Sequence, residues 1–337
     1  MKRTRLICLL IAAVLIFSLA AAGTAAGQEA IKLKFSTAAP TTSSWHPGAE
    51  KFAALVTERT KGKFAITIYP RDELSGGNQA AGIELLQIGA TDIHLQDALV
   101  WSSIAKKSII PCFPWLLPTN AEVDKYVMNG EGGKALRQII SDAGCVCLAV
   151  GENGYRQVAN NRNPIKMPED MKGLKIRVPG SNVHVNLLKY IGADPLTMNQ
   201  SEVYTSLQQG AIDACENTLD LLFTQNTLEV VSHLTLWNYS YDPLFLSVSN
   251  KLWNSLSDEE KVIFQECAEE AMKHQVKAAR ETVESLMKNF GKYPKVQVVT
   301  SLTEDQVAAF KKAVAPIYED YRKTFGEDLF AKFGYTF

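Results

Sequence analysis

Short runs rich in β-branched residues alternate with helical patterns along most of this chain, and this alternation constrains the fold more than any other feature. The opening predicts a strand at 31–36, a helix at 45–60 and a second strand at 63–69. Strands that alternate with helices predict a parallel sheet covered by helices, which is the α/β class. Further strands are expected at 92–96, 145–150, 155–160, 174–178, 211–215, 238–248 and 296–299, and further helices at 79–88, 134–142, 182–191 and 201–209.

One helical pattern is far longer than the others, from Ser257 to about Phe290. Ser257 supplies an N-cap, and the acidic residues 258–260 that follow it suit the positive end of the helix. At 1.5 Å per residue this helix is roughly 50 Å long, which is more than the width of a small domain. We therefore expect it to cross two lobes. More helix is expected after residues 301–304.

The first residues have the pattern of a secretory signal peptide. Three basic residues precede an apolar run at 6–22, and the small residues at 21–27 offer a cleavage site. We expect residues 1–26 to be removed on export to the periplasm. No later apolar run approaches the ~18 residues that a membrane span needs, so the rest of the chain is expected to be soluble, with enough length for two α/β domains.

Charge and cysteine content exclude other classes. The formal net charge is −1 and there is no basic run, which argues against a nucleic-acid partner. Six cysteines in 337 residues are too few for a disulfide scaffold. Cys145 and Cys147 lie on one face of an expected apolar strand, where core packing is the favoured interpretation and a redox or soft-metal site is the alternative.

Catalytic and cofactor motifs are absent from the sequence. There is no Gly-x-Ser-x-Gly elbow and no His-Glu-x-x-His helix, and the segment 130–134 (Gly-Glu-Gly-Gly-Lys) lacks the spacing of a phosphate loop. The histidines form no pair with ligand spacing. We therefore expect a protein that binds no metal ion or cofactor and is not an enzyme.

Polar residues follow two of the expected strands. Arg177 lies near the end of the segment Gly-Leu-Lys-Ile-Arg-Val-Pro at 173–179, and Asn217 follows the strand at 211–215. Parallel sheets bind ligands at the carboxyl ends of their strands. A guanidinium fork and an amide at that edge suit a small carboxylate.

Several segments in a fixed order carry a family resemblance. Over essentially its whole length beyond residue 26, the chain resembles the solute-binding proteins of tripartite ATP-independent periplasmic (TRAP) transporters, of the DctP type. The matching segments are HPGAEKF at 46–52, YP at 69–70 followed by ELSGG at 73–77, GYRQ at 154–157, GLKIRVP at 173–179, GADP at 192–195, EVY at 202–204, LQQGAID at 207–213 and EN at 216–217.

The resemblance implies a two-lobe periplasmic binding protein fold, with a cleft between the lobes, connecting strands and a long helix that spans both. Lobe I would comprise 27–153 and about 243–282, and lobe II 154–242 and about 283–337. It also implies a monomer that captures an organic acid by lobe closure and delivers it to the membrane permease subunits. The alternatives are a ligand-sensing partner of a membrane receptor and a secreted enzyme that acts on an organic acid.

The resemblance also implies site residues. Arg177 would pair with the ligand carboxylate, and Asn217 would contact the same carboxylate or a neighbouring hydroxyl. Their alternatives are a strand-edge arginine and an asparagine that ends a strand. Arg156 matches a second cleft arginine of some relatives, although Arg162 is a nearby competitor for that place. Glu73 matches a polar position of the first lobe's cleft loop, where a solvated carboxylate is equally plausible.

Other candidates belong to the first lobe and the connecting strand. Asn78 and Gln79 replace a charged pair that is common in the family, and neutral amides suit hydroxyls. Tyr239 either lines the hinge side of the cleft or packs the connecting strand. One dominant arginine with several amides favours a sugar acid, such as a uronic or aldonic acid, over a compact dicarboxylate. Residues expected where strand ends of the first lobe face the cleft are Trp45, His46, Gln96 and Asp97.

Overall fold

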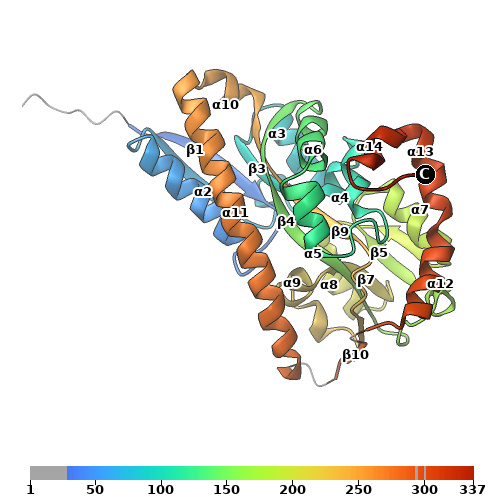
Figure 1. Cartoon of the computed structure of the whole chain (residues 1–337). Coiled ribbons are helices and arrows are strands. Elements are labelled where there is room, and N and C mark those ends of the chain that lie inside the picture. The colour runs from blue at the N-terminus through green and yellow to red at the C-terminus, as the bar shows by residue number, and fades with distance from the viewer. Residues whose placement is uncertain (1–28, 293–294, 300) are drawn as a thin grey trace, which may run out of the picture.

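The computed structural model describes residues 29–337, apart from 293, 294 and 300 (Figure 1). The expected signal peptide at 1–26 lies outside the described residues. The strands of the described part are β1 (Ile31–Thr37), β2 (Phe64–Tyr69), β3 (Ile93–Asp97), β4 (Cys145–Asn160), β5 (Lys175–Val178), β6 (Asp194–Thr197), β7 (Ala214–Thr218), β8 (His233–Thr235), β9 (Tyr241–Ser249) and β10 (Gln297–Val299).

Helices alternate with these strands, as the α/β prediction requires. The α-helices are α2 (His46–Arg59), α3 (Gln79–Gln87), α4 (Ala98–Trp101), α5 (Asn120–Val123), α6 (Glu131–Ser141), α7 (Asn182–Tyr190), α8 (Gln200–Gln208), α9 (Leu219–Thr224), α10 (Asn250–Ser255), α11 (Asp258–Lys288), α12 (Glu304–Val314), α13 (Pro316–Phe325) and α14 (Glu327–Ala331). Shorter turns are η1 (Glu73–Ser75), η2 (Lys106–Cys112), η3 (Asp124–Met128, a π-turn), η4 (Pro168–Met171), η5 (Thr227–Glu229) and η6 (Phe290–Lys292).

The sheet has two halves joined by two crossing strands. Its order is β2-β1-β3-β9-β4-β7-β5-β6, and β8 and β10 add beside β4. β1 is parallel to β2 and β3 in the first half, and β5 is parallel to β6 and β7 in the second. Between the halves, β9 and β4 run antiparallel to their neighbours. This arrangement confirms the two-lobe α/β prediction.

The prediction of separate strands at 145–150 and 155–160 was wrong, because β4 is a single strand of 16 residues. Its first part pairs with β9, and its last five residues pair with β7. The polar and glycine residues at 151–154 looked like a loop in the sequence, but Glu152 and Asn153 are buried and hydrogen-bonded. A register shift between Glu152 and Gly154 marks the passage from one half to the other.

The long helix was predicted correctly. α11 contains 31 residues, and Ser257 forms a capping box with Glu260 at its start. Figure 1 shows α11 running along one side of the molecule from the α10 end to the β10 end. Gln275 fixes it to β4, since its side chain both donates to the Glu152 carbonyl and accepts from the Glu152 amide, each at 2.8 Å.

The C-terminal helices pack on both halves. α12 and α13 contact α7 of the second half. Tyr318 of α13 donates to the Pro114 carbonyl at 2.9 Å, and its ring packs against Phe113, which follows η2. None of the described helices is long and apolar enough to cross a membrane.

Candidate functional site

Arg177 is a buried arginine without an acidic partner. It lies on β5, beside Cys215 of the parallel strand β7, and is 2% exposed. Its Nε donates to the Met198 carbonyl at 2.8 Å. Within the described residues no carboxylate forms an ion pair with it, and burial lowers the pKa of Arg177 to about 10, with Glu216 opposing the shift. A buried charge of this kind is costly unless an anion joins it.

Two glutamine side chains orient the Arg177 guanidinium. Gln200, the first residue of α8, accepts from Nη1 at 3.0 Å, and Gln79, the first residue of α3, accepts from Nη2 at 3.4 Å. These contacts come from opposite halves of the chain. Both glutamines are neutral, so they hold the fork in place and leave its positive charge uncompensated.

Asn217 completes this polar group. It lies on β7, and its Nδ2 donates to Gln200 Oε1 at 3.1 Å. The side-chain oxygen Oδ1 of Asn217 accepts from the Thr218 backbone amide at 2.9 Å, which fixes the direction of the side chain. The sequence-based expectation that Arg177 and Asn217 come together at the ends of neighbouring parallel strands therefore matches the geometry.

A narrow cavity of about 20 Å³ adjoins these residues, and a recess of about 180 Å³ shares Ala38, Gln79, Gln200 and Gln225 with it. Both halves of the chain contribute to its walls. The cavity is lined by Ala38, Ala39, Trp45, Gln79, Asp97, Arg156, Arg177, Pro179, Gln200, Asn217, Leu221 and Gln225.

Arg156 lines the same cavity, but its charge is already compensated. It donates from Nε and Nη2 to the two carboxylate oxygens of Glu216, and from Nη1 to Asp242 Oδ2 at 2.6 Å. Burial opposes the ionisation of Glu216, but Arg156 and His184 outweigh it and hold the pKa of Glu216 well below its usual range. Arg156 is thus an internal ion-pair partner, and Arg162 lies outside the cavity, paired with Asp213 at 3.6 Å.

Trp45 and Asp97 line the cavity from the first half of the chain. Trp45 donates to Asn153 Oδ1 at 3.0 Å, and Asn153 donates to Asp242 at 2.8 Å. Asp97 caps α4 by accepting from the Val100 amide at 3.0 Å. Burial raises the pKa of Asp97, and burial together with Asp97 raises the pKa of Asp242 to about 8. This side of the cavity therefore resists further negative charge.

Three candidates lie away from the cavity at the ends of helices and turns. His46 begins α2, and its Nε2 lies 3.3 Å from Glu50 Oε1. Glu73 is exposed on η1. Asn78 is the N-cap of α3 and accepts from the Ala81 amide at 3.1 Å. His46 and Asn78 are thus engaged in local contacts, whereas Glu73 is exposed to solvent.

Gln96 and Tyr239 are buried but do not reach the cavity. Gln96 accepts from the Asp97 amide at 3.0 Å. Tyr239 donates to Glu216 at 3.2 Å and lies 2.6 Å from His184 Nε2, so it supports the ion pair of Arg156 from behind. The geometry of Tyr239 fits packing of the connecting strand rather than lining of the cleft.

Gln200 and Gln225 line the cavity although neither was among the candidates. Gln200 lies three residues after the end of the short edge strand β6, and a polar residue near the carboxyl end of a strand was the signal that could have identified it. Gln225 follows α9, and its buried Oε1 has no hydrogen-bond partner in the described structure. That free acceptor suits a hydroxyl donor.

The described residues outside the cavity give no support for a metal site or a reactive cysteine. The described residues contain no group of three or more His, Cys, Asp or Glu side chains that could hold a metal ion. Their five cysteines are free and buried. Burial raises the pKa of the Cys145 thiol to about 12 and also raises that of Cys147, so both remain protonated and pack as small apolar groups.

Two α/β halves meet at a buried arginine without an acidic partner among the described residues, an arrangement that suits the capture of an anion. The chain belongs to the bacterial extracellular solute-binding protein family 7 (DctP), whose family model matches residues 35–324. It is therefore a solute-binding protein of the TRAP type and not an enzyme, as the sequence motifs predicted.

Three similar proteins illustrate the family. The 2,3-diketo-L-gulonate-binding periplasmic protein YiaO of Escherichia coli (strain K12) is 32% identical over 282 residues, which are 84% of this chain and 85% of YiaO. A TRAP periplasmic solute-binding protein of Ralstonia eutropha H16, solved with bound (S)-2-acetolactate, has a TM-score of 0.85 and 30% identity, covering 90% of this chain and 97% of that one. One from Sulfurospirillum deleyianum DSM 6946, solved with succinate, has a TM-score of 0.84 and 28% identity, covering 91% and 99%.

Proposed function

We propose that this chain is a periplasmic carrier that binds a small organic acid with its carboxylate on Arg177, closes its lobes around that acid and delivers it to the permease subunits of a TRAP transporter. It acts as an exported monomer after loss of residues 1–26. The lobe boundaries predicted from sequence are part of this proposal, with α12 to α14 of lobe II also packing on residues 113–115 of lobe I.

The observation that carries this proposal is the unpaired charge of Arg177. A planar guanidinium donates two parallel hydrogen bonds to a carboxylate, and the pair is strongest where water is excluded. Arg177 has its Nε fixed on a backbone carbonyl, and the partners of its two terminal nitrogens in the described part of the chain are neutral amides. These contacts use three of the five guanidinium N–H groups, so a ligand carboxylate accepts from the remaining two and supplies the missing negative charge.

The surrounding groups favour one carboxylate with hydroxyl or keto oxygens beside it. Arg156 is neutralised by Glu216 and also donates to Asp242, so the described residues that line the cavity offer no second free cation to a second carboxylate. Amides of Gln79, Asn217 and other cavity residues match hydroxyl and carbonyl groups. Among the relatives, diketogulonate and acetolactate fit this description, whereas succinate does not. We propose a hydroxy or keto monocarboxylic acid, including a sugar acid.

Closure would use contacts between the halves. Both the amide and the hydroxyl of Ser44 donate to Asp220 Oδ2 at 2.8 Å, joining the loop before α2 to the start of α9. Gln79 and Arg177 make a second link. A ligand that contacts both halves favours the closed state by its differential affinity.

The test begins with mass spectrometry of the acid released by denaturing the purified protein. A thermal-shift panel of hydroxy acids, keto acids, sugar acids and dicarboxylates follows, since a ligand at 100 times its Kd adds about 2.7 kcal/mol of stability. Recovery of an intact monocarboxylic acid supports the proposal. Stabilisation by succinate or malate alone contradicts the ligand class, and conversion of the acid during incubation contradicts the carrier function.

A further inference from the structure

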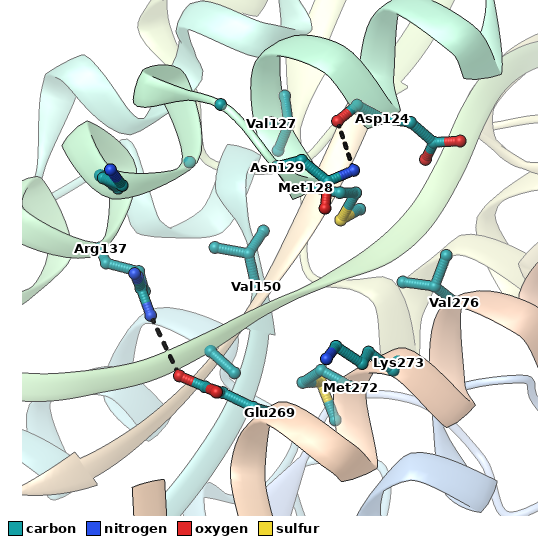
Figure 2. Close-up of a pocket in the computed structure, with 14 residues that line it drawn as sticks. Asp124, Val127, Met128, Asn129, Arg137, Val150, Glu269, Met272, Lys273 and Val276 are labelled. Atoms are coloured by element: carbon teal, nitrogen blue, oxygen red, sulfur yellow. Dashed lines mark hydrogen bonds and ion pairs between the residues drawn. The ribbon is translucent and has the colours of Figure 1, made fainter. Parts of the chain in front are cut away.

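A wider cavity of about 420 Å³ lies away from Arg177, between α6, the π-turn η3, β4 and α11 (Figure 2). None of its lining residues belongs to the cavity of the candidate site. Cavities of about 300–1,000 Å³ that combine apolar walls with a few polar groups are the usual sites of small organic ligands. The volume and lining of this one fall within that description.

Part of the lining of this cavity is apolar and includes two methionines. Val127 and Met128 come from η3, Val150 from β4, and Met272 and Val276 from α11. Figure 2 shows these side chains surrounding a common space. Thioethers make favourable contacts with the edges of aromatic rings, so two methionines from different elements suit a flat ring.

The charged groups that line the cavity favour an anion. Asp124 is held by two hydrogen bonds from Arg280, at 2.6 and 3.0 Å, and Glu269 lies 3.9 Å from Arg137. Lys273 has no hydrogen bond and no ion pair with any described residue, and Figure 2 shows it extending from α11 over the cavity. The acidic side chains are thus already matched, while one ammonium is left without a partner.

The walls are also preformed by close backbone packing. A side chain at Gly133 would place its Cβ 1.9 Å from the Val127 carbonyl oxygen, and one at Gly130 would place it 2.3 Å from that of Lys125. The glycines of the segment 130–134 therefore allow α6 to begin directly against the π-turn. π-turns of this kind often occur at functional sites. This gives a structural role to a glycine-rich segment that matched no phosphate-binding motif.

We propose that this cavity is a second binding site, for a small aromatic carboxylate whose ring lies between Met128 and Met272 and whose carboxylate pairs with Lys273. The site is separate from the cleft, so its occupant binds together with the transported acid and does not compete with it. This inference does not depend on the proposed transport ligand.

Calorimetric titration with 3-phenylpropionate tests the proposal, using the full mature chain. Lys273→Glu should weaken binding about tenfold, as expected for reversal of one exposed charge that faces the ligand. Lys277→Glu is the matched control, because Lys277 lies one turn further along α11, is exposed and lies outside the cavity; it should bind like wild type. The neutral amide 3-phenylpropanamide should also bind about tenfold more weakly than the acid.

Amide chemical shifts locate the probe. The proposal expects changes at Gly130, Gly133 and Val276. Shifts confined to Asn217 and its neighbours would place the probe in the cleft and overturn the second site. Equal affinity of wild type and Lys273→Glu, or absence of binding at millimolar 3-phenylpropionate, would overturn it as well.

Discussion

Gln200 Oε1 accepts hydrogen bonds from both Arg177 Nη1, at 3.0 Å, and Asn217 Nδ2, at 3.1 Å. One side chain from the start of α8 therefore joins the polar groups of two neighbouring strands. The guanidinium and the amide are held as a unit before any ligand arrives, which reduces the ordering cost of binding.

Loss of the arginine should abolish tight binding. Arg177→Ala removes the partner of a desolvated carboxylate and should cost about 2–5 kcal/mol of binding free energy. Arg177→Lys should also weaken binding, because an ammonium keeps the charge but lacks the bidentate fork. Calorimetry with the identified acid measures both. Arg162→Ala, at an exposed arginine outside the cavity, is the control, and wild-type affinity in Arg177→Ala would remove the basis of the proposed site.

The shared acceptor offers a second test. Gln200→Ala leaves donors of Arg177 and Asn217 without their partner, and unsatisfied buried groups cost about 1–3 kcal/mol each. We expect ligand affinity to fall about tenfold. Gln208→Ala, at the exposed end of the same helix, should leave the affinity unchanged. Equal effects of the two substitutions would indicate a general change in α8.

The contact between Ser44 and Asp220 should stabilise the closed form. Asp220→Ala removes both hydrogen bonds, and burial of Asp220 makes this contact hard for water to replace. We expect a larger radius of gyration by small-angle scattering with subsaturating ligand, together with weaker affinity. Compaction identical to wild type at every ligand concentration would exclude a role for this contact in closure.

Glu216 predicts a definite pH dependence of stability. Its folded-state pKa lies well below the unfolded value, so its stabilising effect is complete above about pH 4.5 and declines as the pH falls toward the folded-state pKa. At pH 7, Glu216→Gln should lower the free energy of unfolding by about 3–5 kcal/mol, because Arg156 loses a buried partner.

Urea denaturation of wild type and Glu216→Gln at pH 7 and at pH 3.5 measures this difference, which should be smaller at the acidic pH. Glu202→Gln, at an exposed position on α8, controls for the loss of any one carboxylate. A difference that grows on acidification would show that Glu216 is not the ionised partner of Arg156.

Local patterns predicted much of this molecule from its sequence. The capping box at Ser257 and the uninterrupted helical period gave the start and length of α11, because both depend on neighbouring residues. Arg177 and Asn217 were predictable as a pair, since parallel strands present their carboxyl ends at one edge.

Contacts between distant residues could not be predicted in this way. Arg156 donates to carboxyl groups of residues 60 and 86 positions away, and no local pattern indicates that both converge on it. The same holds for the buried polar residues Glu152 and Asn153, whose partners lie on α11 and β9. Polar side chains inside a strand resemble a loop until those partners are known.

The unbroken course of β4 has a consequence for folding. Neither half of the molecule contains the whole of this strand, since the first half pairs with its beginning and the second half with its end. A fragment that ends between the halves would expose a row of unpaired backbone groups and would not be an independent folding unit. The whole chain should therefore unfold in one cooperative transition, and movement between the lobes must come from bending of continuous strands rather than from a flexible linker.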